Sequence, residues 1–288
     1  MDISNLKDIE DRLTINYYTE SKVRKNTGLI YFQRYLKIAP LSLALWRATE
    51  AQELARHKLT KPVLDIGCGF GEFAGVFFNS QIEVGVDIDY RDIAKATSSG
   101  KYKKTIIADA RNLPFGDNTF NTIISISTLE HIQNNFEVFK EAYRVLKPGG
   151  KFYYTVPTDK LADGLLTVNI FNFLRLKKLS AIYFRIFNKV FKHVFLPNEQ
   201  TWIKLTKKAG FKVVDVKGTL PKITLFLFEL ALPFSLPSQL GRLFLGNRLV
   251  FAPNLKIKLL RPLVRFIKSD PDFRANIFVI ASKPIARK

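Results

Sequence analysis

The sequence has very little cysteine, and this limits how the chain can be stabilised. Cys68 is the only cysteine among 288 residues. One thiol cannot form a disulfide within the chain, so no disulfide framework is possible and a reducing compartment is expected. Residues 1–10 are polar and acidic, without the basic and apolar regions of a secretory signal. We therefore expect a cytoplasmic protein.

Long apolar runs are also absent. No stretch of about 18 uncharged apolar residues occurs, so a conventional membrane-spanning helix is not expected. The nearest candidate, residues 223–236, is too short and contains Glu229 and Pro233. Hydrophobic residues nevertheless make up 47% of the chain, which is enough to build one core with large elaborations.

Acidic residues are scarce in the second half of the chain. The net charge is +20. Residues 1–156 are nearly balanced, with 21 Lys and Arg against 18 Asp and Glu, whereas residues 157–288 have 24 against 7. This asymmetry suggests that the C-terminal half faces an anionic partner. Nucleic acid, an anionic membrane surface and a phosphorylated substrate are the candidates.

Predicted strands and helices alternate between residues 61 and 157. We expect strands at 62–66, 83–86, 105–108, 122–127 and 151–156, and helices at 72–79, 91–98 and 135–146. Two more strands, at 211–216 and 275–282, would complete a sheet. The strands are short apolar runs without clear alternation, as in sheets covered on both faces. The pattern predicts an α/β fold with a doubly wound, mostly parallel, seven-stranded sheet.

The core is interrupted by two segments rich in Phe, Leu, Lys and Arg. The predicted organisation is an N-terminal helical cap (1–60), a core with the glycine-rich loop (61–157), a helical insertion (158–199), a core continuation (200–219), an apolar and basic insertion (220–273) and a last core strand with its tail (274–288).

A glycine-rich turn follows the first predicted strand. Residues 63–71 read VLDIGCGFG, with glycines spaced G-x-G-x-G. The dinucleotide fingerprint is G-x-G-x-x-G, which this is not. Asp65 stands at the strand end, where a carboxylate suits a cationic amino group better than a pyrophosphate. An ordinary strand–turn–helix and a dinucleotide site remain alternatives for this loop alone.

Carboxylates also end the next two predicted strands. Asp87 could accept hydrogen bonds from both hydroxyls of a ribose, as an acidic residue does in dinucleotide sites. Asp109 could accept from an adenine amino group. Each could instead be a helix cap or turn residue, but their occurrence at consecutive strand ends favours a nucleoside ligand.

With these residues in place, the chain resembles the class I, Rossmann-like S-adenosylmethionine-dependent methyltransferases, especially the branch related to ubiquinone and menaquinone methyltransferases. The resemblance rests on VLDIGCGFG (63–71), GVDID (85–89), DARNLPF (109–115), FNTIISISTLEHI (120–132) and RVLKPGGKF (144–152). It implies S-adenosylmethionine as the cofactor. The residues expected to contact it are Asp65, Gly67, Cys68, Gly69, Gly71, Asp87, Ile88, Asp109, Ala110 and Ser125. No metal is expected.

Methyl transfer from an activated cofactor needs mainly an acceptor held in line, and a base only when the acceptor carries a proton. His131 follows the fourth predicted strand and is the candidate base. The alternative is that His131 caps a helix or hydrogen-bonds within the fold, since the resembling family keeps this motif with diverse acceptors.

The two insertions contain amphipathic, basic stretches. Residues 179–195 place Leu179, Ile186 and Val190 on one helical face and lysines and arginines on the other, and residues 261–268 repeat the pattern. Such helices are typical of membrane surfaces. Packing of these stretches on the core, or a nucleic-acid surface, are the alternatives. Nucleic acid is the less expected partner, because the aromatic residues lie among Leu and Ile rather than in a polar basic surface.

These observations predict a cytoplasmic methyltransferase, peripheral on the inner face of a membrane through residues 179–195 and 223–268. The expected acceptor is lipophilic: a quinone precursor, a polyprenyl-linked sugar or a phospholipid headgroup. Methylation of RNA or of a soluble small molecule, and a non-catalytic cofactor-binding scaffold, are the alternatives. The sequence carries no signal of oligomeric state.

Overall fold

The sheet at the centre of the protein has seven strands in the order β3-β2-β1-β4-β5-β7-β6. The computed structural model describes residues 27–245 and 248–285. The strands are β1 (Val63–Ile66), β2 (Ile82–Asp87), β3 (Tyr102–Ile107), β4 (Phe120–Ile126), β5 (Leu146–Pro157), β6 (Lys212–Gly218) and β7 (Asn276–Ser282). β1 to β5 pair in parallel, and β7 runs antiparallel to β5 and β6. The doubly wound, mostly parallel fold predicted from the sequence is confirmed.

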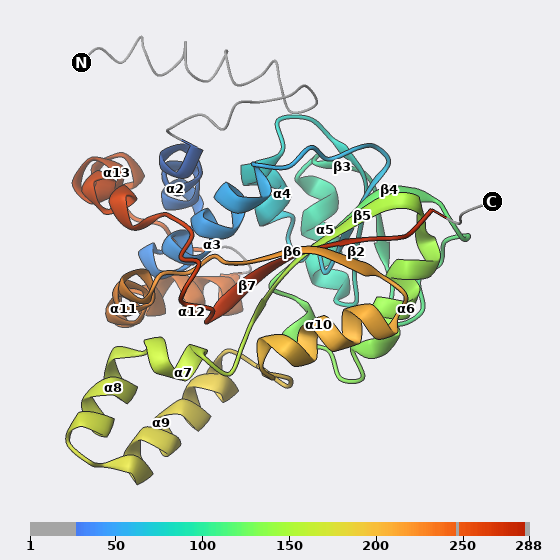
Figure 1. Cartoon of the computed structure of the whole chain (residues 1–288). Helices are drawn as coiled ribbons and strands as arrows, with labels where there is room; N and C mark the ends of the chain where they lie inside the picture. Colours follow the sequence, from blue (N-terminus) through green and yellow to red (C-terminus); the bar gives the residue numbers. More distant parts are fainter. Residues whose placement is uncertain (1–26, 246–247, 286–288) are drawn as a thin grey trace.

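Helices cover both faces of this sheet (Figure 1). Those associated with the core are α2 (Thr27–Ile38), α3 (Leu41–Leu54), α4 (Glu72–Phe77), α5 (Tyr90–Ser98), α6 (Phe136–Val145) and α10 (Glu199–Lys208). Helices α2 to α5 share one hydrophobic cluster with Ile124, Tyr153 and Phe278 of the sheet. Helices α6 and α10 pack on the opposite face through Phe139 and Trp202. The parallel strands are thus buried on both sides, which explains their continuous apolar runs.

Two groups of helices extend this core. The first insertion forms α7 (Leu161–Gly164), α8 (Leu166–Phe173) and α9 (Lys177–Val190), an arm that extends away from the sheet (Figure 1). The second forms α11 (Lys222–Ala231), η2 (Pro233–Ser235), α12 (Leu236–Leu245), α13 (Pro253–Leu260) and η3 (Arg261–Phe266), which lie beside α2 and α3.

Local sequence explains several element boundaries. Asp89 caps α5 by accepting hydrogen bonds from the backbone N–H groups of Arg91 and Asp92. Asn198 caps α10 in the same way through Thr201. Two expectations differ from the structure. Residues 147–150, which separate the helix expected at 135–146 from the strand expected at 151–156, lie inside β5, with Gly149 at φ +79°. Residues 261–266 form a 3₁₀ helix rather than an α-helix.

Candidate active site

The glycine-rich turn lies where the strand order reverses. β1 is flanked by β2, which leads to one edge of the sheet, and by β4, which leads to the other. Open α/β sheets bind ligands at this switch point, beyond the carboxyl ends of the strands. The backbone N–H groups of Gly67 and Cys68 donate to the Val86 carbonyl at 2.9 and 3.0 Å, which fixes the turn against the end of β2.

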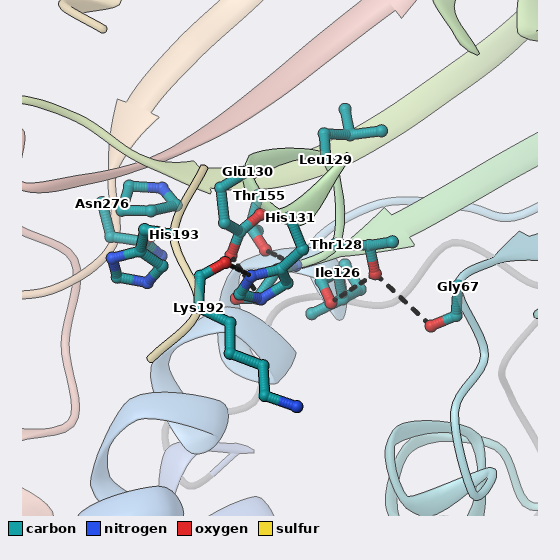
Figure 2. A network of polar contacts seen from close by, with 12 residues as sticks. Gly67, Ile126, Thr128, Leu129, Glu130, His131, Thr155, Lys192, His193 and Asn276 are labelled. Atoms are coloured by element: carbon teal, nitrogen blue, oxygen red, sulfur yellow. Dashed lines mark hydrogen bonds and ion pairs between the residues drawn. The ribbon is translucent and has the colours of Figure 1, made fainter. Parts of the chain in front are cut away.

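The turn also fits closely against the end of β4. Gly67 has φ +74°, and a Cβ atom at this position would lie 2.1 Å from the Thr128 side chain. The Thr128 hydroxyl donates to the Gly67 carbonyl at 3.4 Å (Figure 2). Gly67 is therefore required by close approach to Thr128, which brings the segment after β4 next to the turn.

Asp87, Ile88 and Gly69 form an open edge of the site. The Asp87 carboxylate accepts the Gly69 N–H at 2.9 Å and the Asp89 N–H at 3.1 Å. An ionised carboxylate has about four acceptor positions, so two remain for ligand hydroxyls. Ile88 is 67% exposed. A Cβ on Gly69 would meet no atom nearer than 4.0 Å, so the space above this residue is open. A polar acceptor beside an exposed apolar side chain suits an adenosyl group.

Asp109 and Ala110 follow β3 along the same edge and are half-buried. The Asp109 carboxylate accepts from the Arg111 guanidinium at 2.6 Å, and this hydrogen bond lowers the pKa of Asp109. The structure thus places Asp109 where the sequence predicted, and shows Arg111 as its partner.

Four of the residues expected to contact the cofactor lie behind the turn. Ser125 is completely buried and its hydroxyl donates to the Ile66 carbonyl at 3.0 Å, so its side chain is engaged within the fold. The Cys68 side chain is also buried, and a Cβ on Gly71 would meet Ser99 at 3.1 Å and the buried Tyr102 ring at 3.2 Å. These side chains point to the protein side of the loop, which their position in the sequence does not distinguish.

Asp65 is the fourth. It is 3% exposed, and its carboxylate accepts a 2.7 Å hydrogen bond from the Tyr102 hydroxyl. Burial raises the pKa of Asp65 to about 7, and the Tyr102 hydrogen bond opposes this increase. We had expected Asp65 to present an open carboxylate to the ligand. Instead, its side chain lies beneath the glycine-rich turn and supports it.

Glu50 of α3 anchors the strand ends on the other side of the turn. It is fully buried. One of its oxygens accepts from Ser127 at 2.6 Å, Thr155 at 2.8 Å and Asn276 at 3.1 Å, and the other pairs with Arg47 at 2.9 Å. Ser127 has φ +47°, a conformation that costs roughly 1–3 kcal/mol in a non-glycine residue. The Glu50 network holds this strained link between β4 and the next segment.

His131 lies in the short helix η1 (Leu129–His131), and both of its ring nitrogens face protein groups (Figure 2). Nδ1 lies 3.0 Å from the Lys192 carbonyl, to which it can only donate. Nε2 lies 3.6 Å from Glu130 Oε1. The ring also stacks on His193, with centroids 5.7 Å apart. The structure therefore supports the alternative that His131 hydrogen-bonds within the fold through Nδ1, while its side chain stays 39% exposed.

Glu130 is the residue that sequence reasoning missed. It is 2% exposed, and Oε2 has no hydrogen-bond partner within the part of the chain that the structure describes. Burial raises the pKa of Glu130 to about 8. Burial also lowers the pKa of His131, and lowers that of His193 to about 4. All three pKa shifts favour the uncharged forms of these side chains, and Glu130 lies beside the imidazole ring of His131.

The second insertion reaches the glycine-rich turn, which its sequence did not signal. Arg248 makes a bidentate ion pair with Glu72, the first residue of α4, at 2.6 and 3.2 Å. The Arg242 guanidinium lies 4.2 Å from the centroid of the Phe70 ring. Arg242 also approaches Asp92 at 3.7 Å. Through these contacts, Arg242 of α12 and Arg248 hold the second insertion against the glycine-rich turn and the start of α4. No cluster of potential metal ligands occurs among residues 27–245 and 248–285.

Comparison with known proteins gives a consistent family. Residues 64–154 match a family model described as a methyltransferase domain. The chain is 31% identical over 140 residues to phosphoethanolamine N-methyltransferase 3 of Arabidopsis thaliana, covering 46% of this chain and 28% of that protein. It is 36% identical over 103 residues to probable tRNA methyltransferase 9B of Homo sapiens, covering 35% and 22%. The chain thus spans less than a third of the length of these two relatives.

A solved structure from Thermotoga maritima, a S-adenosylmethionine-dependent methyltransferase described as a possible histamine N-methyltransferase, aligns with a TM-score of 0.57. The alignment covers 84% of this chain and 91% of that one at 21% identity. At this identity the similarity shows the fold. The relatives differ in the acceptors for which they are named, so the family is common to them and the acceptor is not.

Proposed function

The chain carries a class I, S-adenosylmethionine-dependent methyltransferase domain, and we propose that the whole protein transfers the methyl group to a lipophilic acceptor at an anionic membrane surface. The proposal extends to location: the protein would be peripheral on the cytoplasmic face. The residues present fit the cofactor, because Asp87 has free acceptor positions, Ile88 offers an exposed apolar contact and Gly69 leaves open space.

S-adenosylmethionine supplies an already activated methyl group, so the chain's own residues have to position the acceptor and accept any proton it releases. Asp87, Ile88 and Gly69 would hold the adenosyl part. Close packing of Thr128 on Gly67 places η1 beside this edge. Within η1, the imidazole of His131 and the buried carboxyl of Glu130 together form a proton reservoir.

Exposed apolar side chains on the first insertion carry the proposal of a membrane-associated acceptor. Phe173 at the end of α8 is 86% exposed. Along α9, Leu179, Ile182, Ile186 and Val190 are exposed at helical spacing, so this stripe does not pack on the core. The lysines and arginines of α9 flank the stripe, as in helices that lie at membrane interfaces.

The second insertion repeats this chemistry. Phe234 is 83% exposed, and Phe244, Phe251 and Leu259 are exposed as well. No single helix in the described ranges is long and apolar enough to cross a membrane, but α11 and the following 233–242 segment pass that test as a pair bent by 56°. This bent pair fits an element that enters a membrane without crossing it as a single helix.

The charge of both insertions favours an anionic surface. Residues 160–197 contain seven Lys and Arg and one acidic residue, Asp163. Residues 222–268 contain eight and also one, Glu229, which is buried and accepts from Tyr183 at 2.6 Å. Each cation near an anionic leaflet contributes about 1 kcal/mol. Aromatic residues embedded among leucines fit lipid better than nucleic acid.

Sedimentation with vesicles tests this proposal. We expect the protein to bind vesicles of phosphatidylcholine with phosphatidylglycerol at low salt, and to bind pure phosphatidylcholine vesicles less well. Ile186→Asp with Val190→Asp should weaken binding to the anionic vesicles. Val214→Asp, an equally exposed apolar site on β6, should not. Absence of binding to anionic vesicles, or equal loss in the control, would contradict the membrane proposal. Co-purified nucleic acid would support an RNA acceptor instead.

A further inference from the structure

An apolar cavity of about 370 Å³ lies within the second insertion. It is bounded by α11, η2, α12, α13 and the junction of α2 with α3. Of its 13 lining residues, 11 are apolar, and the other two are Ser238 and Lys256. This volume and composition are typical of sites for small molecules with large apolar parts.

The cavity opens to the surface through exposed apolar side chains. Leu230, Phe234 and Phe251 line it and are also exposed. Contiguous exposed apolar surface on a folded protein is typical of a binding site. The mouth of the cavity is therefore continuous with the apolar surface that we propose to face the membrane.

Polar and charged groups of the wall restrict the occupant. The Ser238 hydroxyl is buried and has no hydrogen-bond partner in the described ranges of the chain. It can donate one hydrogen bond to an occupant that is otherwise hydrocarbon. Lys256 is held at the wall by donating to the Ala39 carbonyl at 2.8 Å. The only acidic residue of 222–268 is the buried Glu229. This segment therefore presents no exposed negative charge that would repel an anionic amphiphile.

The wall of the cavity is also held against the cofactor loop, which is the glycine-rich turn at residues 67–71. Leu249 and Val250 line the cavity directly after Arg248, which pairs with Glu72 at the start of α4. Arg242 of α12, one turn after Ser238, stacks on Phe70 of the loop. The segments that enclose the cavity are thus the same ones that are latched to the proposed methyl-transfer site.

We propose that this cavity binds the hydrocarbon tail of the lipophilic acceptor, an anionic amphiphile drawn from the membrane. The inference rests on the proposed function, which makes the acceptor a lipid. The cavity supplies apolar contact for one chain, and Ser238 contacts the first polar atom of that chain. The ion pair of Arg248 with Glu72 fixes the position of the cavity wall relative to the cofactor loop.

Fluorescence titration of the full chain with dansyl-undecanoic acid, a single-chain anionic probe, tests this inference. We expect saturable binding with a blue shift. Leu230→Trp, which fills the cavity from its exposed mouth, should weaken binding by about tenfold or more. Leu259→Trp should leave it unchanged, because Leu259 is exposed on α13 and does not line the cavity. Saturable binding that only Leu230→Trp weakens supports the inference.

Three results would overturn the inference. The first is no probe binding by wild type, or equal binding by wild type and Leu230→Trp. The second is probe binding that appears only after removal of residues 1–26, which would make the occupant a segment of this chain. The third is a wild-type dimer, by light scattering, that Leu230→Trp dissociates without any probe binding.

Titration of the same samples with S-adenosylmethionine separates the two proposals. Cofactor binding without probe binding rejects only the cavity proposal, and probe binding without cofactor binding rejects the proposed function.

Discussion

The Tyr102 hydroxyl donates a 2.7 Å hydrogen bond to the buried carboxylate of Asp65, across the intervening strand β2. The path is open because Gly85 of β2 has no side chain: a Cβ there would lie 2.7 Å from the Tyr102 ring and 3.1 Å from Cys68 Sγ. One missing methyl group therefore lets a tyrosine of β3 support the end of β1, where the cofactor loop begins.

Gly85→Ala should displace the Tyr102 ring and disturb the loop. We expect it to destabilise the protein by roughly 1–3 kcal/mol, the usual cost of overpacking, and to weaken S-adenosylmethionine binding. Gly75→Ala is the matched control, because Gly75 lies in α4 with no atom within 4 Å of the added Cβ. It should stabilise the protein by about 0.5–1 kcal/mol. Urea unfolding measures both changes, and equal effects would refute the role of Gly85.

Substitution of Glu50 should destabilise the ends of β4, β5 and β7 that it holds together. Glu50→Ala removes the acceptor for Ser127, Thr155 and Asn276 and leaves Arg47 without its partner, so we expect a loss of about 3–5 kcal/mol in unfolding free energy. Glu137→Ala, which breaks the exposed pair with Lys140, should cost less than about 1 kcal/mol. Comparable losses in the two variants would show that the Glu50 network is not structural.

Glu130 should make stability depend on pH. Its folded-state pKa of about 8 lies above the value of about 4.3 for an unfolded chain. The native state thus holds the proton more tightly, so this group's contribution is complete below about pH 4.3 and is lost as pH rises to about 8. Glu130→Gln stays uncharged. Its stability relative to wild type should increase over this window by an amount on the order of 1 kcal/mol per pH unit.

Thermal unfolding of wild type and Glu130→Gln from pH 5 to pH 9 measures this difference. Asp163→Asn, which neutralises an exposed carboxylate of α7, is the control and should show no such trend. A difference between Glu130→Gln and wild type that is constant with pH would contradict the raised pKa. Activity assays over the same range then test whether the reservoir serves proton transfer.

The latch between the second insertion and the cofactor loop should appear as thermodynamic coupling. Arg248 is almost buried and its ion pair with Glu72 is bidentate, so a double-mutant cycle with Arg248→Ala and Glu72→Ala should give an interaction energy of about 0.5–3 kcal/mol. The exposed pair of Lys160 and Asp163 should give less than about 1 kcal/mol. A coupling near zero for Arg248 and Glu72 would mean that the insertion is not held to the loop.

The sequence predicted the sheet because its elements depend on local patterns. Apolar runs of strand length, separated by helices, specify a parallel sheet, and glycines and aspartates at strand ends mark its ligand edge. The sequence did not reveal whether a side chain at a strand end faces the cleft or the interior. Successive residues of a strand face opposite sides, so a shift of one residue reverses the answer. Ser125 and Cys68 were assigned to the cleft for this reason, although both are buried.

The proton-holding cluster could not be predicted, because its properties arise from tertiary burial. Glu130 stands beside His131 in the sequence, but its raised pKa depends on enclosure by segments far apart in the chain. Val194 and Phe195 of the first insertion, for example, donate to the Glu130 carbonyl. The contacts of Arg248 and Arg242 with the cofactor loop likewise join residues more than 140 positions apart, with no local signal.

The most direct test of the central claim is isothermal titration of the full chain with S-adenosylmethionine. Asp87→Ala removes the carboxylate proposed to hold the ribose, whereas Asp117→Ala removes an exposed carboxylate in the turn before β4, at the opposite edge of the sheet. We predict that wild type and Asp117→Ala bind alike, and that Asp87→Ala binds at least about tenfold more weakly, a loss of about 1.4 kcal/mol. No binding by folded wild-type protein, or undiminished binding by folded Asp87→Ala, would contradict the assignment of this cleft as the cofactor site.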